Sequence, residues 1–122
     1  MAKKILYVQT SGTDTPERLY APLILASTAR AMDIEATVYF LAKGVTAVMK
    51  GNAEKIKLGT FPSLKEVIDQ AAAAGVRMLV CGQSCQMLGL KGAPEEFENP
   101  AKVVGAATLN DLVLEHDAVL SF

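Results

Sequence analysis

The sequence predicts a single α/β domain in which five short strands and the helices between them build one parallel sheet. The chain has 122 residues, close to the usual size of one domain. Hydrophobic residues make up 51% of it and aromatic residues only 6%, a mixture typical of parallel strands that are buried on both faces. Strand-like runs also alternate with helical patterns along the chain, as in successive βαβ units.

The five predicted strands are short apolar runs bounded by polar residues, glycine or proline. They cover residues 3–9, 35–41, 76–81, 102–106 and 118–122. Because a helical segment is expected between strands, the connections should be right-handed crossovers within one domain that spans residues 1–122.

The first helix is expected to begin at Thr15-Pro16-Glu17 and to run to about Met32. The threonine hydroxyl can cap the helix, proline suits the first turn, and the acid suits the positive end of the helix dipole. Pro22 lies inside this segment, so the regular helix either starts near Ala21 or kinks at the proline.

This first helix is apolar around its circumference. Apart from the Tyr20 hydroxyl, the polar side chains between residues 19 and 32 are those of Ser27, Thr28 and Arg30. A helix of this kind is not expected to face water. It is either buried beneath loops of its own subunit or part of a subunit interface, and we favour the interface.

The remaining helices have recognisable starts. Residues 44–49 are predicted to form a short helix, and Ser63 with Glu66 forms a capping box that opens the next one. Gly75 is the expected stop signal of that helix. A helical stretch should follow Gly82 directly, and the last helix should start at residues 108–111.

Composition and charge exclude several classes of protein. The formal net charge is −1, and the twelve basic residues are scattered along the chain, so no concentrated footprint for nucleic acid is present. No apolar stretch approaches the roughly 20 residues that span a bilayer. The apolar run 5–8 is too short for a secretion signal. We therefore expect a cytoplasmic protein without nucleic-acid or membrane partners, in which thiols stay reduced.

The two cysteines stand out, in the segment Cys81-Gly82-Gln83-Ser84-Cys85. Ligands of open parallel sheets bind beyond the carboxyl ends of the strands, where Cys81 is expected, with Cys85 in the first turn of the following helix. Free amides there favour a thiolate. Gly82 permits close approach of another sulfur, and Gln83 and Ser84 can hold an anionic sulfur by hydrogen bonds.

Other interpretations of the two thiols stay open. Either cysteine can simply pack as a small apolar residue. A redox pair is also possible, although the spacing exceeds the familiar Cys-x-x-Cys by one residue. No metal is expected, because two cysteines and one histidine cannot complete a zinc site. We expect His116 to cap its helix or face water, and loop 10–13 to be a plain turn because it lacks the P-loop spacing.

Six segments, taken together in their order and spacing, carry a resemblance over essentially the whole chain. They are residues 15–18, 61–64, 75–77, 80–82 with Gly89, 105–108 and 119–122. On these segments the sequence resembles the DsrE/DsrF-like family, which includes small YchN-type proteins and the sulfur-relay subunits of TusBCD and DsrEFH. The resemblance implies a three-layer α/β/α fold, homotrimers or hexamers, and cytoplasmic sulfur handling.

In the sulfur-relay members, a cysteine at the end of this strand, eight residues before a glycine, accepts sulfur as a persulfide. Cys81 and Gly89 match that placement, so the resemblance implies that Cys81 is the sulfur acceptor. Cys85 lies outside the match and is a possible second acceptor or resolving thiol. The sulfur donor and acceptor proteins stay unknown.

The favoured hypothesis is a sulfurtransferase-like carrier without a cofactor, rather than a turnover enzyme. The alternative is a non-catalytic oligomeric binding module whose inter-subunit pocket holds a small ligand or nucleotide. A redox switch between Cys81 and Cys85 is the third possibility.

Overall fold

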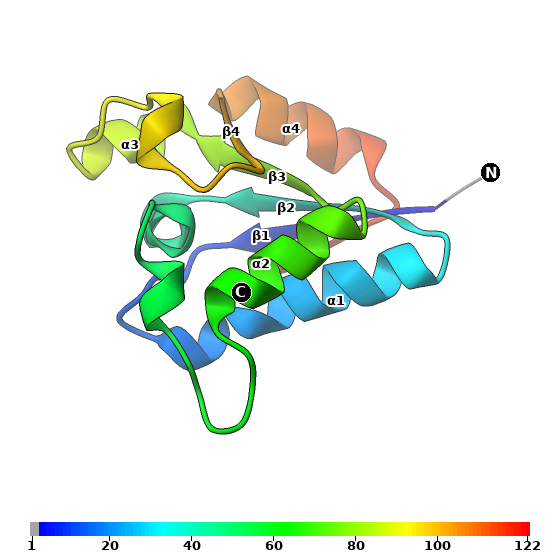
Figure 1. Ribbon diagram of the computed structural model, residues 1–122. Helices are drawn as coiled ribbons and strands as arrows, with labels where there is room; N and C mark the ends of the chain where they lie inside the picture. The colour runs from blue at the N-terminus through cyan, green and yellow to red at the C-terminus, as the bar shows by residue number, and fades with distance from the viewer. Residues whose placement is uncertain (1–2) are drawn as a thin grey trace.

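The computed structural model describes residues 3–122, which fold into three layers (Figure 1). The middle layer is a sheet of five strands, all parallel and in the spatial order β4-β3-β2-β1-β5. The strands are β1 (Lys4–Gln9), β2 (Glu35–Phe40), β3 (Arg77–Cys81), β4 (Ala101–Val104) and β5 (Ala118–Ser121). This architecture confirms the predicted α/β/α fold with a five-stranded parallel sheet.

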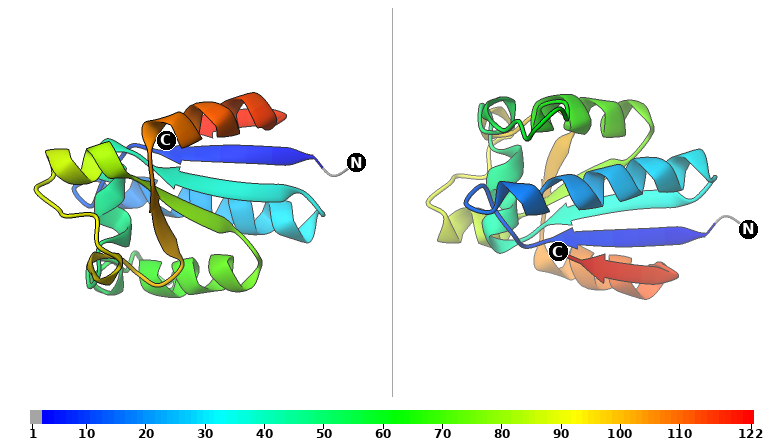
Figure 2. Two further views of the ribbon diagram at one scale, coloured as in Figure 1. Left: turned by 90° about the horizontal axis from the view of Figure 1, so that it is seen from above. Right: turned by 90° about the horizontal axis from the view of Figure 1, so that it is seen from below.

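Helices cover both faces of the sheet. The helices α1 (Tyr20–Ala31) and α2 (Leu64–Ala73) lie side by side on one face, and α4 (Ala106–Glu115) lies on the other (Figure 2). The short helix α3 (Gly82–Met87) continues directly from the end of β3. Four 3₁₀ segments complete the chain: η1 (Pro16–Arg18), η2 (Ala42–Val48), η3 (Ala53–Lys55) and η4 (Pro94–Glu96).

Alternation along the strands creates two apolar cores, because successive side chains point to opposite faces of a sheet. The larger core lies on the side of α1 and α2 and includes Val38, Phe40 and Val80. The smaller core lies beneath α4. Its buried members are Leu6, Val8, Tyr39, Leu79, Cys81 and Leu112. The core to which a strand residue belongs therefore shows toward which face of the sheet its side chain points.

Pro22 does not kink the first helix. The helix α1 begins at Tyr20, so Pro22 is its third residue and lies in the first turn. Amides there have no partner within the helix, and proline therefore costs no hydrogen bond. One face of α1 is buried within its own chain, whereas Ile24, Leu25 and Met32 stay exposed.

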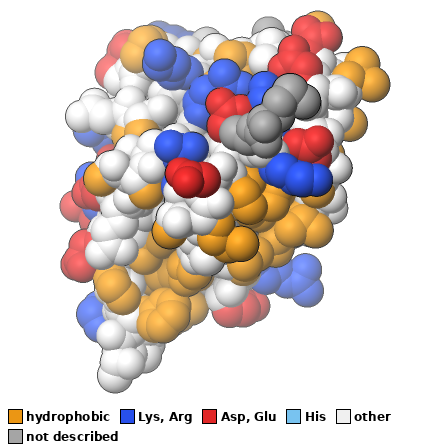
Figure 3. All heavy atoms as spheres, turned by 90° about the vertical axis from the view of Figure 1, so that its right-hand side faces the viewer, with side chains coloured by type: hydrophobic (Ala, Val, Ile, Leu, Met, Phe, Trp, Pro, Cys, Tyr) orange, Lys and Arg blue, Asp and Glu red, His pale blue; other side chains and the backbone are white. Residues whose placement is uncertain are grey.

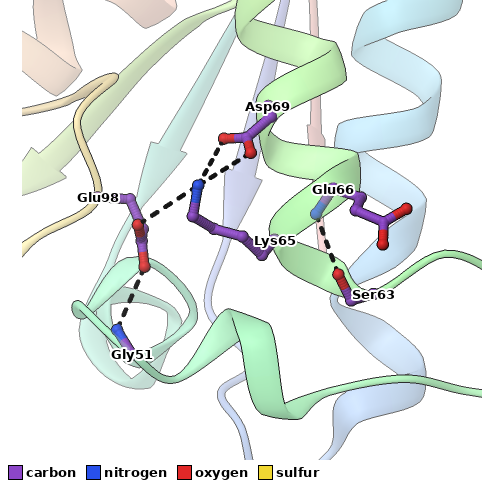
Figure 4. Close-up of polar contacts among 6 residues, drawn as sticks. All are labelled: Gly51, Ser63, Lys65, Glu66, Asp69 and Glu98. Carbon is purple, nitrogen blue, oxygen red and sulfur yellow. Dashed lines mark hydrogen bonds and ion pairs between the residues drawn. The ribbon is translucent and has the colours of Figure 1, made fainter.

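The structure shows one half of the capping box predicted for α2. The Ser63 hydroxyl accepts a hydrogen bond from the Glu66 amide at 3.3 Å, which satisfies one of the free amides of the first turn (Figure 4). The helix ends at Ala73, and Gly75 follows with a φ of 95°. This left-handed conformation suits glycine and turns the chain back into β3.

One buried carboxylate ties three segments together beside α2. Glu98 accepts a hydrogen bond from the Gly51 amide at 3.2 Å, and its other oxygen lies 3.9 Å from the Lys65 ammonium (Figure 4). The ion pair of Lys65 with Asp69, at 2.9 Å, holds the lysine in place. Glu98 thereby fixes the loop before β4 against α2 and the loop between η2 and η3.

The predicted boundaries differ from the observed ones at two places, the segment after β2 and the junction between β4 and α4. The segment predicted as a helix over 44–49 is the 3₁₀ segment η2, which already starts at Ala42. The fourth strand ends at Val104 rather than at Ala106, and α4 begins at Ala106 rather than at Thr108, with Gly105 as its cap. Two alanines are strong helix formers, and here they join the helix rather than the strand.

Within residues 3–122, no helix combines the length and the apolar character needed to cross a membrane.

Candidate functional site

Cys81 is the last residue of β3 and the cap residue of α3, so no loop separates the thiol from the helix. Its strand neighbour is Val104, the last residue of β4. The side chain points into the smaller core, and the residue is only 3% exposed. The predicted position at the carboxyl edge of the sheet is therefore correct, and the thiol lies just under the surface rather than on it.

Ser84 is oriented by a backbone contact from η2, the segment that follows the neighbouring strand β2. Its buried hydroxyl oxygen accepts a hydrogen bond from the Ala42 amide at 2.7 Å. With that acceptor position occupied, the hydroxyl proton is free to be donated to Cys81. Ala42 has a φ of 53°, a left-handed conformation that is uncommon for alanine and that recurs at functional sites.

Polar groups of Ser84, Tyr39 and Gln83 influence the ionisation of Cys81. Burial raises the pKa of the Cys81 thiol, but hydrogen bonds from the Ser84 hydroxyl and amide, the Tyr39 hydroxyl and the Gln83 amide outweigh burial, and the pKa lies below its ordinary value. Hydrogen bonds of this kind favour the charged form of an acid. In the thiol form, the Cys81 sulfur donates to Gln83 Oε1, with 3.7 Å between the two atoms.

Tyr39 is a member of the site that the sequence analysis missed. It is fully buried in β2, and its hydroxyl donates to the Gly105 carbonyl at 3.1 Å. Burial, followed by the hydrogen bond to Cys81, raises the pKa of Tyr39, so the hydroxyl keeps its proton at neutral pH. That single proton can serve either the Gly105 carbonyl or the Cys81 thiolate. The available sequence signal for this role was the position of the tyrosine, one residue before the end of the neighbouring strand.

Cys85 has different surroundings. It is buried in the larger core, on the side of α1 and α2. Burial, together with the negative charges of Cys81 and Glu96, raises the pKa of the Cys85 thiol. The two cysteines are four residues apart in sequence but belong to different cores, and only Cys81 has a lowered pKa.

An open pocket of about 440 Å³ lies beside the residues that follow Cys81, and the buried thiol itself is not part of its lining. Gly82, Gln83 and Gln86 of α3 line one side, and Val104 and Gly105 line the other. The pocket therefore includes the two residues that follow Cys81 and the strand neighbour of Cys81.

Gly82 packs closely against β4. A Cβ atom at this position would lie 3.3 Å from the Val104 carbonyl oxygen and 3.6 Å from Val103 Cγ1. Glycine therefore lets α3 pack closely against β4. Its predicted role in the approach of another sulfur stays a prediction.

His116 and the loop after β1 do not belong to this site. His116 caps α4, with its Nδ1 atom 2.6 Å from the Leu112 carbonyl oxygen. It lines a separate pocket of about 290 Å³ with Lys4 and Arg77, at the amino ends of the strands. Loop 10–13 forms a turn in which the Thr10 and Ser11 amides donate to the Phe122 carbonyl. Both observations agree with the structural roles expected from the sequence.

Among the described residues, no three His, Cys, Asp or Glu side chains gather closely enough to hold a metal ion.

The chain was compared with known protein families, sequences and structures. The model of the DsrE/DsrF-like family matches residues 3–122. In structure, the chain is similar to the ychN protein from E. coli, with a TM-score of 0.79, 20% sequence identity and full coverage of both chains. At this identity the likeness shows the fold alone.

Two proteins of Methanocaldococcus jannaschii are similar in sequence, and both are uncharacterized. MJ0989 is 31% identical over 123 residues, which cover 98% of this chain and 99% of that protein. MJ0760 is 28% identical over 107 residues, which cover 86% of this chain. The matched region is only 38% of the length of MJ0760, so the chain corresponds to one part of that larger protein.

Proposed function

The chain belongs to the DsrE/DsrF-like family, and from this membership and the surroundings of Cys81 we propose that the protein carries sulfane sulfur as a persulfide on Cys81. The family suggests a function related to sulfur relay in general. The observation that carries the specific proposal is the set of donors around Cys81, which lower the pKa of this one thiol despite its burial. A thiolate is the nucleophilic form of cysteine.

The proposed reaction is a transfer between sulfur atoms. The Cys81 thiolate attacks the outer sulfur of a donor persulfide and forms a new sulfur–sulfur bond. The bond between the two donor sulfurs breaks, and the donor leaves as a thiolate with that electron pair. The proton stays on the transferred sulfur, and no net oxidation occurs. The reverse steps pass the sulfur to an acceptor thiolate, so the exchange needs no cofactor.

The neighbours of Cys81 have distinct parts in this proposal. The Ser84 hydroxyl and the amides of Ser84 and Gln83 stabilise the thiolate before attack. The Gln83 side chain contacts the sulfur and also lines the open pocket, so its rotation would admit the donor. Gly82 lines the pocket next to Cys81 and adds no side chain to it. Cys85, with its raised pKa, stays a spectator.

We also propose that the carrier works in the cytoplasm as a homo-oligomer, a trimer or a hexamer. Apolar side chains gather on the side of the molecule where α1 ends (Figure 3). Exposed apolar residues of α1 and of the edge strand β5 include Leu25, Met32, Val119 and Leu120. Such side chains on an unpaired strand edge favour association, and light scattering in solution would test it.

The carrier is tested by intact mass after incubation with N-acetylcysteine persulfide. The wild-type protein should gain about one sulfur atom, and prior alkylation should block the gain. Cyanide, which removes sulfane sulfur as thiocyanate, should restore the original mass.

Two matched variants locate the acceptor. Cys81→Ser should lose all loading while keeping its circular dichroism spectrum and its size in solution. Cys85→Ser, the same change four residues away, should load like the wild-type protein. Undiminished loading of Cys81→Ser, or no gain in the wild-type protein with this donor, would contradict the proposal. The second result would favour a non-catalytic binding module.

A further inference from the structure

The charge in the lining of the open pocket beside Cys81 is positive. Lys91 and Gly92, of the loop after α3, line the pocket together with Gly105 and residues of α3 and β4. Lys91 is the one charged residue in this lining, and no carboxylate lines it among the described residues. The pocket therefore presents a positive charge, and its link to the buried thiol is Gln83, which lines the pocket and contacts the Cys81 sulfur.

The Lys91 ammonium is not committed to an ion pair within residues 3–122, where no carboxylate lies within 4.0 Å of it. Glu96 is nearby, but its carboxylate is held by backbone amides, those of Lys91 at 3.2 Å and Ala93 at 2.8 Å. These bonds lower the pKa of Glu96, the Ala93 amide most strongly, and they fix the loop that carries the lysine. The Lys91 charge also contributes to the lowered pKa of Glu96, but without an ion pair within 4.0 Å among the described residues the ammonium can bind an anion in the pocket.

The rest of the lining favours a small polar ligand. The amides of Gln83 and Gln86 supply neutral hydrogen-bond groups, and three glycines, at positions 82, 92 and 105, leave backbone uncovered. Among residues 3–122, no aromatic side chain lines the pocket. A volume of about 440 Å³ falls within the range of small-molecule sites. The features together fit a short, hydrogen-bonding molecule with one anionic end.

Resting on the carrier function proposed above, we propose that this pocket binds a low-molecular-mass persulfide that bears a carboxylate, with the carboxylate at Lys91 and the outer sulfur beside Gly82. The donor is then a small metabolite-sized molecule rather than a protein. The sulfur transfer is the same reaction as in the proposed function. Cys81 takes the outer sulfur, and the remaining thiolate leaves the pocket with the electron pair of the broken bond.

The test compares two donors that differ by one charge, N-acetylcysteine persulfide and its methyl ester. The loading rate of Cys81 is followed by intact mass for the wild-type protein and for Lys91→Met. An exposed ion pair contributes about 0.2–1 kcal/mol, so the carboxylate donor should load Lys91→Met up to about fivefold more slowly. The ester should load both proteins equally. Added salt should reduce the wild-type preference for the carboxylate donor.

Two controls make the result specific. Lys55→Met removes an exposed lysine outside this pocket and should leave both rates unchanged, whereas Lys91→Arg should keep the preference for the carboxylate donor. The inference is wrong if Lys91→Met slows both donors alike, or if the wild-type protein loads the ester as fast as the carboxylate donor; in either case Cys81 still takes sulfur and the carrier function stands. If neither donor loads the wild-type protein, the carrier function itself fails.

Discussion

Replacing Ser84 by alanine should raise the pKa of Cys81 and make its thiol less reactive. The serine hydroxyl is the first of the hydrogen-bond donors that lower this pKa, and its orientation is set by the Ala42 amide at 2.7 Å. A hydrogen bond to a charged group contributes about 1.5–3 kcal/mol. At about 1.4 kcal/mol for each factor of ten, the ionisation constant of Cys81 should fall roughly ten- to hundredfold.

The rate of alkylation by iodoacetamide, measured against pH, reports this constant directly. The measurement uses the Cys85→Ser background, so that Cys81 is the one thiol in the chain. At a fixed pH below the pKa, the Ser84→Ala protein should react roughly ten- to hundredfold more slowly, because the thiolate fraction falls by that factor. The midpoint of the pH profile should move upward.

Ser27→Ala is the matched control, because the Ser27 hydroxyl donates only to the Leu23 carbonyl within α1. It should leave the profile of Cys81 in place. Ser84→Ala also leaves the part-buried Ala42 amide without its acceptor, which should cost about 1 kcal/mol of stability. The rates are therefore compared where circular dichroism shows both proteins folded. A folded Ser84→Ala protein with an unchanged profile would refute the role given to this hydroxyl.

Two further predictions concern stability. Burial and then Cys81 hold the pKa of Tyr39 above 10.0 in the folded protein. The contribution of Tyr39 to the free energy of unfolding is therefore fully present below about pH 10 and falls as the pH rises further. Tyr39→Phe should make that fall shallower by about 1.4 kcal/mol per pH unit in urea unfolding, and an unchanged slope would speak against a buried neutral tyrosine. Gly44→Ala should cost about 3 kcal/mol or more, because its Cβ would clash with the backbone carbonyl of Gln9. Gly105→Ala, whose Cβ would meet nothing within 4 Å, is its control, and equal urea midpoints for the two variants would contradict the packing.

The sequence was sufficient to predict the five strands in their order along the chain. Each is a short apolar run, and buried parallel strands leave a strong signal of that kind. Boundaries shifted where tertiary contacts overrode the local pattern. Ala42 begins η2 two residues early because its amide bonds Ser84 on another element. The spatial order of the strands could not be predicted, because it depends on contacts far apart in the sequence.

The candidate site was predicted only along its own segment. Cys81, Gly82, Gln83 and Ser84 are consecutive, so their proximity follows from the strand-to-helix junction. Tyr39 reaches Cys81 from the adjacent strand, in the register that pairs β2 with β3. A residue 42 positions away has no local sequence signal toward Cys81, and only the folded sheet brings the two together.

The fold also sets the two thiols apart, which bears on the possible redox switch. Cys81 points into the core beneath α4, and Cys85 is buried in the core on the side of α1 and α2. A disulfide requires the two sulfur atoms to approach to about 2.05 Å, so one of them would have to leave its core. Cys81 also forms the thiolate more readily than Cys85, because burial raises the pKa of Cys85.

Mild peroxide treatment of the folded protein should therefore oxidise Cys81 alone. The expected product is a sulfenic acid, which gains about one oxygen atom and is trapped by dimedone. In urea the two cores are lost, so the same treatment should convert the cysteines to a disulfide, with a loss of about two hydrogens. If the folded protein shows that loss, and Cys85→Ser abolishes it, then the sheet does not keep these sulfurs apart, and the assignment of Cys85 as a spectator is wrong.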